Sequence, residues 1–101
     1  MKPDTKQTIG QQTISEDLEF HGQIVGNTTV NSGVIFTLHG QIVGDLLLME
    51  NSNVILHGMV NGNVINQGGN LDVFGMICGN LSKNGGTTTI HPKALVTGHI
   101  H

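Results

Sequence analysis

The sequence lacks tryptophan, tyrosine and arginine altogether, and it has one alanine and one cysteine among 101 residues. Charged residues make up 11% of the chain, where roughly 25% is usual for a globular domain. With alanine and the charged helix formers so scarce, a helical bundle or a coiled coil is excluded. Four lysines and a formal net charge of −3 also exclude a surface that neutralises a nucleic-acid backbone.

Long apolar runs are missing too, and none approaches the roughly 20 residues that span a bilayer. The segment from Met1 to Gln12 is polar and has no apolar region typical of a signal peptide. A lone Cys78 rules out an internal disulfide. We therefore expect one small cytoplasmic domain without membrane association.

Glycine, by contrast, is abundant, and its placement is periodic. The segment 22–26, Gly-Gln-Ile-Val-Gly, recurs identically at 40–44 and in altered form at 58–62 and 75–79, with a degenerate copy at 94–98. A fixed period of this kind indicates a repeat architecture. Nine glycines occupy two columns of the repeat and are expected at its corners: Gly22, Gly40, Gly58 and Gly75, then Gly26, Gly44, Gly62, Gly79 and Gly98.

Apolar and polar residues alternate within each copy, which is typical of extended strands. A period of about 18 residues divides into three sides of six, and apolar residues recur at this spacing: Ile24, Val30, Phe36, Ile42, Leu48, Val54 and Val60. No helix is available to connect the strands. The sequence therefore predicts an all-β, three-sided parallel β-helix. The period does not encode its hand, because left-handed hexapeptide coils share the spacing of six; the chirality of parallel crossovers favours a right-handed coil.

Aligned copies predict columns of residues that stack from coil to coil. One column ends in Val96 and another in Ile100; a third is expected to pass from Leu71 to Ile90, and a fourth to end at Pro92. Residues 83–86 are expected to form the turn that absorbs the irregular spacing. The predicted solenoid covers 16–101, and 1–15 is expected to be a flexible polar tail.

The pattern apolar-x-Gly-x-apolar-x-Gly-Asn/Asp-apolar, as in 38–46 and 56–64, resembles the bactofilins, a family of bacterial cytoskeletal proteins. The resemblance covers residues 16–101. It implies a right-handed, three-sided β-helix that polymerises end to end into filaments without a nucleotide.

A histidine precedes the first glycine in three copies, at His21, His39 and His57, and the column continues with Phe74 and Lys93. Imidazoles stacked on one outward face could bind a transition metal. No carboxylate or thiolate stands beside them in a zinc-like spacing. We therefore expect an exterior stacking ladder, with no metal site and no cofactor.

A second polar column follows the second glycine: Asn27, Asp45, Asn63, Asn80 and then His99. Asn and Asp tolerate left-handed backbone and can bond neighbouring main chain at corners. A calcium-binding repeat would need several acids per turn, and this column has one. Uniform short turns and the absence of paired carboxylates lead us to expect no enzyme and no catalytic residues.

The end coils of a solenoid lack a neighbour, so their strand edges are open to further strands. We expect the assembly ends near Leu18 and Phe20 and near Val96 and Ile100. The expected side-face contacts are His21, His39, His57, Phe74, Met59 and Met76. The sequence thus predicts a structural protein that self-assembles, with a further protein on its side face as an additional partner. Two alternatives stay open: a stand-alone binding module, such as an immunity or adaptor protein, and a trimeric fibre segment.

Overall fold

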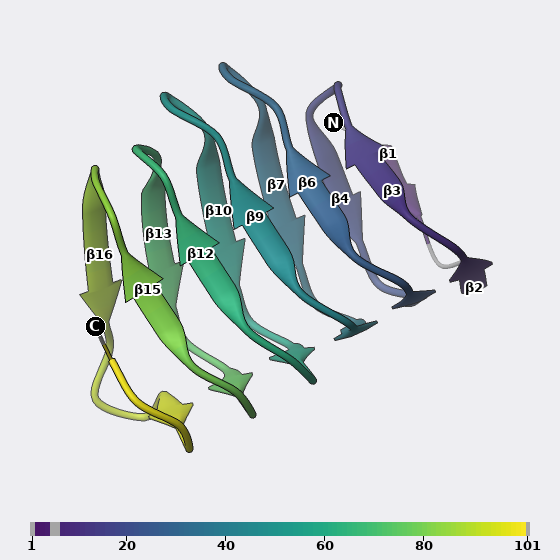
Figure 1. Ribbon diagram of the computed structural model, residues 1–101. Helices are drawn as coiled ribbons and strands as arrows, with labels where there is room; N and C mark the ends of the chain where they lie inside the picture. Colours follow the sequence, from purple (N-terminus) through teal and green to yellow (C-terminus); the bar gives the residue numbers. More distant parts are fainter. Residues whose placement is uncertain (1, 5–6, 101) are drawn as a thin grey trace.

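The computed structural model describes residues 2–4 and 7–100. Seventeen short strands, with no helix among the described residues, form a solenoid whose three parallel sheets run along one axis (Figure 1). The predicted three-sided parallel β-helix is confirmed.

Each sheet takes one strand from each coil, except that the last coil adds only the isolated bridge between Leu81 and Ile100 to the third sheet. The first sheet contains β1 (Lys2–Asp4), β4 (Leu18–Phe20), β7 (Ile35–Leu38), β10 (Asn53–Leu56), β13 (Asn70–Val73) and β16 (Thr87–Ile90). The second contains β2 (Gln7–Ile9), β5 (Gln23–Val25), β8 (Gln41–Val43), β11 (Met59–Val60), β14 (Met76–Ile77) and β17 (Leu95–Val96). The third contains β3 (Gln12–Ile14), β6 (Thr28–Val30), β9 (Leu46–Leu48), β12 (Val64–Asn66) and β15 (Leu81–Lys83).

The hand of the coil follows from the path of the chain in Figure 1. The coils advance from the N-terminal end on the right to the C-terminal end on the left, while the chain descends in the far sheet (β4, β7, β10, β13) and ascends in the near one (β6, β9, β12, β15). This is the path of a right-handed coil.

The apolar residues spaced six apart form the core. All seven residues of that series are at most 2% exposed, because one side chain from each face of each coil points to the axis. Strand pairing stacks them as predicted: Ile24 pairs with Ile42, Ile42 with Val60, Val60 with Ile77 and Ile77 with Val96. The core is thus a set of aliphatic columns parallel to the axis.

The columns that enter the last coil differ from the prediction by two residues. Leu71 pairs with Thr88, and Ile90 pairs with Val73, so Pro92 closes no column. The extra residues lie in 91–94, where the Ala94 N–H donates to the His91 carbonyl, 2.9 Å away. A longer corner at this point keeps the strands on both sides in register.

The N-terminal segment also differs from the expected tail. Within 1–15, the described residues contain β1, β2 and β3, which pair with β4, β5 and β6. This first coil has a period of 16 residues, as in the pair Gln12 and Thr28, and it places Thr8 opposite Ile24. Both departures hide the coil from a search for apolar residues 18 apart.

Glycine is required at the corners because successive coils approach closely there. A Cβ on Gly58 would overlap the carbonyl oxygen of Gly40, and a Cβ on Gly75 would overlap that of Gly58. Gly26 and Gly44 have φ values of 151° and 148°, which residues with a side chain rarely adopt. These contacts confirm the predicted corner role for the glycines named here.

Candidate functional site

Aromatic rings form a continuous stack on the outside of the corner that follows the first sheet. The ring centroids lie 4.4 Å apart for His21 and His39, 4.9 Å for His39 and His57, 4.8 Å for His57 and Phe74, and 3.9 Å for Phe74 and His91. The rings are within 13° of parallel. The coil spacing of about 4.8 Å imposes this stack, which we call the ring ladder. The expected stacking of the three histidines is confirmed.

The ladder ends in a residue that the sequence did not predict. His91, rather than Lys93, stacks on Phe74. The reason is the register of the last coil: Val73 pairs with Ile90, so the residues that follow them occupy equivalent positions.

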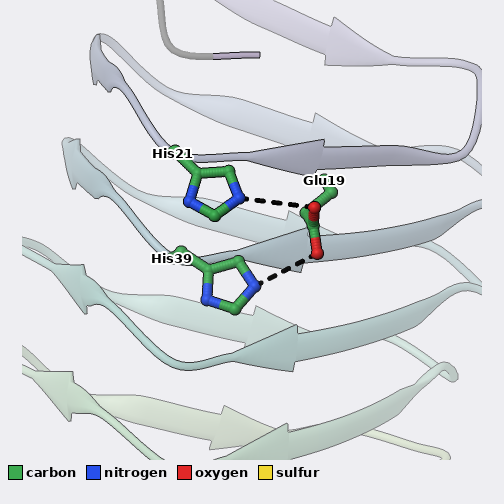
Figure 2. Close-up of polar contacts among 3 residues, drawn as sticks. All are labelled: Glu19, His21 and His39. Atoms are coloured by element: carbon green, nitrogen blue, oxygen red, sulfur yellow. Dashed lines mark ion pairs between the residues drawn. The ribbon is translucent and has the colours of Figure 1, made fainter. Parts of the chain in front are cut away.

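A carboxylate lies beside the first two rings, contrary to the expectation from sequence spacing. Figure 2 shows Glu19 beside the stacked rings of His21 and His39, with one oxygen directed to each ring. The Nε2 atom of His21 lies 3.3 Å from Oε1, and that of His39 lies 3.4 Å from Oε2. Residues two apart on a strand share a face, and the next coil brings His39 alongside. That parity rule, applied across coils, is the sequence signal that would have found Glu19.

The electrostatics of this cluster act on the carboxyl group. The pKa of Glu19 lies below its ordinary value, and the hydrogen bond from His21 is the largest cause. Desolvation opposes the shift. The charge of His21, and the hydrogen bond and charge of His39, lower the pKa further. The side chains of the three residues are 33–40% exposed. The Glu19 carboxyl group is therefore ionised near neutral pH, and the cluster is accessible from solvent.

A reduced version of the cluster occurs three coils later. Asp72 belongs to the same column as Glu19, and its Oδ1 lies 3.3 Å from Nε2 of His91. Phe74 occupies the position that His21 holds beside Glu19. This carboxylate consequently contacts one imidazole instead of two.

The Asn/Asp column forms a hydrogen-bonded ladder along another corner. Each side-chain oxygen accepts a hydrogen bond from the backbone N–H of the next residue in the column, with N–O distances of 2.8–2.9 Å. The successive residues are Asn27, Asp45, Asn63, Asn80 and His99, the last of which only donates. The predicted bonding to main chain is confirmed. The left-handed backbone lies instead at the preceding Gly26 and Gly44, and none of these five residues has a positive φ.

The residues predicted for the assembly ends divide into two groups. Phe20 is 2% exposed and Leu18 is partly buried, because β1 covers both, so they are not at the N-terminal end. At the other end, Val96 is half-buried, whereas Ile100 is 46% exposed. Leu18 and Phe20 therefore do not form the N-terminal end, whereas Val96 and Ile100 lie in the last coil, where their role in assembly stays a prediction.

The two methionines of the predicted side face lie on the second sheet, separate from the ring ladder. Met59 pairs with Met76, and this outward column reads Gln23, Gln41, Met59, Met76 and Leu95 along the axis. The Nε2 of Gln23 donates to Oε1 of Gln41, 3.1 Å away. The column thus changes from polar to apolar toward the C-terminal end.

No protein-family model, curated protein or solved structure matches this chain. The resemblance to bactofilins stays a prediction that rests on the residues quoted above. Among the described residues, no helix has the length and apolar character needed to cross a membrane.

Proposed function

We propose that this chain is a non-enzymatic structural protein that assembles end to end, in the manner of the bactofilins that it resembles. In this role, the stacking of coils continues from one subunit to the next. The stacked coils themselves would perform this role, which needs no catalytic residue.

The observation that carries the proposal is the character of the last coil. Three of its large apolar side chains are exposed: Ile90 by 38%, Leu95 by 53% and Ile100 by 46%. Ile90 lies in β16 and Leu95 in β17, and both strands stand at the edges of their sheets and pair on one side only. Open backbone groups beside exposed apolar surface favour the addition of another strand.

A parallel solenoid also supplies a suitable geometry for growth. All strand pairs between the described coils are parallel, so a further coil of the same kind can continue each sheet. An end that joins to a different end of the next copy makes an open, repeating contact. Such contacts produce filaments rather than closed dimers.

Charge at the last coil tests the proposal. Leu95→Lys and Ile100→Lys should each leave the circular dichroism spectrum unchanged, because these side chains are exposed in the single chain. Each should abolish large assemblies, because contact with the next copy would bury a lysine charge without a partner. Met49→Lys is the matched control, because Met49 is 38% exposed on a middle coil. Sedimentation and negative-stain microscopy of the full chain report the assemblies.

Filaments that persist in both end variants would contradict the proposal. A monodisperse monomer of the unaltered chain at high concentration would contradict it as well, and would favour the alternative of a binding module that uses one flat face. A trimer would favour the fibre segment.

A further inference from the structure

We propose that Glu19, His21 and His39 bind a divalent transition-metal ion of the Zn²⁺ class on the outside of the solenoid. The site is separate from the assembly role, because it lies on the outer side of the second and third coils and not on an end surface. It also replaces our expectation that the histidine column has no metal site.

The donor atoms suit such an ion. Two imidazole nitrogens and a carboxylate are ligands that Zn²⁺, Ni²⁺ and Cu²⁺ accept in proteins. Ligand atoms about 2.1 Å from a tetrahedral ion lie roughly 3.4 Å from one another. The two nitrogen–oxygen separations here are 3.3 and 3.4 Å, and the three ligand atoms all lie within 4.8 Å of one another.

The surrounding structure holds the donors in place. Glu19 is in β4, which pairs with β7, the strand just before His39. Stacking keeps the two imidazole rings 6° from parallel, so both Nε2 atoms face the same carboxylate (Figure 2). Small rotations of these partly exposed side chains suffice to close the triad on one ion, and water from the open side can complete the coordination.

The chain contains its own comparison. His57 is in the same ring ladder, but the positions that correspond to Glu19 beside it are Thr37 and Ile55. Asp72 has a carboxylate beside His91, but the second imidazole is replaced by Phe74. Of the carboxylates at Glu19 and Asp72, only that of Glu19 lies beside two ring nitrogens.

Calorimetric titration of the full chain with Zn²⁺, followed by NMR of the histidine rings, tests the site. We expect one ion per chain, with the largest shifts at His21 and His39, and a thermal midpoint that rises with Zn²⁺ concentration. Glu19→Gln and His39→Ala should each weaken binding at least about tenfold. His57→Ala is the matched control and should leave the affinity unchanged.

A gain-of-function variant gives an independent measurement. Phe74→His completes the second set of donors, so it should raise the stoichiometry from one ion to two, and it should restore one ion when combined with Glu19→Gln. Absence of that gain would contradict the donor rule on which the proposal rests. Zn²⁺ binding that is absent in the unaltered chain, or that is unchanged in Glu19→Gln and His39→Ala, would overturn it.

Discussion

Thr28 places a hydroxyl group in a column that is aliphatic in the three coils after it. Its column continues with Leu46, Val64 and Leu81, and Thr28 itself is 1% exposed. The hydroxyl oxygen has no hydrogen-bond partner among the described residues. A buried polar group in this state costs free energy that an apolar group of the same shape would not.

Thr28→Val should therefore stabilise the chain by about 1 kcal/mol, because valine keeps the shape and removes the unpaired hydroxyl. Chemical denaturation monitored by circular dichroism measures the change. Thr29→Val, on the outward side of the same strand, is the control and should stay within about 0.5 kcal/mol of the unaltered chain. A clear loss of stability in Thr28→Val would show that the hydroxyl is bonded in solution.

Asn66 is also a buried polar residue, but unlike Thr28 it has hydrogen-bond partners for its side chain. It takes the place of Leu48 in a core column and is fully buried. Its Oδ1 accepts the N–H groups of Gly68 and Gly69, at 3.2 and 2.8 Å, and its Nδ2 donates to the Gly69 carbonyl, 3.1 Å away. The predicted apolar series stops at Val60, one step before Asn66, and the sequence could not show a corner that closes around an amide.

The pKa of Glu19 is a direct measure of its contact with the two imidazoles. His21→Ala should raise this pKa toward its ordinary value, and His39→Ala should raise it less, because the hydrogen bond from His21 is the larger cause of the lowering. A pKa that is lowered in the folded chain means that the contact stabilises the fold above the pKa of the unfolded chain. The contribution is lost as pH falls through the lower, folded pKa.

A carbon-detected NMR titration of the glutamate carboxyls measures these values. His57→Ala should leave the pKa of Glu19 unchanged, because the residues of the Glu19 column that lie beside His57 are Thr37 and Ile55. An unchanged pKa in His21→Ala would contradict the geometry of Figure 2.

At the scale of elements, strands and corners carry different demands. Strands need an alternating pattern and tolerate many outward residues, as the column from Gln23 to Leu95 shows. Corners that hold the first glycine column need the absence of a side chain, because the carbonyl of the coil before fills the space of a Cβ. Corners such as 91–94 can instead lengthen without disturbing the pairing of β13 with β16 or of β14 with β17.

Gly58→Ala should destabilise the chain by at least ~2 kcal/mol, because the new methyl group meets the backbone of Gly40 on the coil before, which cannot move without breaking strand pairing. Thermal and chemical denaturation measure the loss. Asn61→Ala, at an exposed position of the same coil, is the matched control and should change stability little. Equal effects of the two substitutions would contradict the close-approach argument.

At the scale of the whole molecule, the repeat made most of the fold predictable. The three sides, the core columns through Ile42 and Val60, and the corner glycines all follow from residues 18 apart, because each coil repeats the same requirements. What could not be predicted lies where the repeat changes: the 16-residue first coil, the longer corner before Leu95, and Asn66. In the site, the stacked rings were predictable from the period, whereas the position of Glu19 beside two of them depends on side-chain parity across two coils.

The parallel stacking of the coils has a consequence for molecular length. Each coil contacts the coil before and the coil after, and an 18-residue step returns every outward and inward position to its own column. A chain with one more middle coil would be about 4.8 Å longer, with the same two end surfaces and the same corners. Length and end chemistry are thus independent variables in this architecture: duplication of a single coil can reset the spacing between whatever the two ends join, in fixed increments, without redesign of either end.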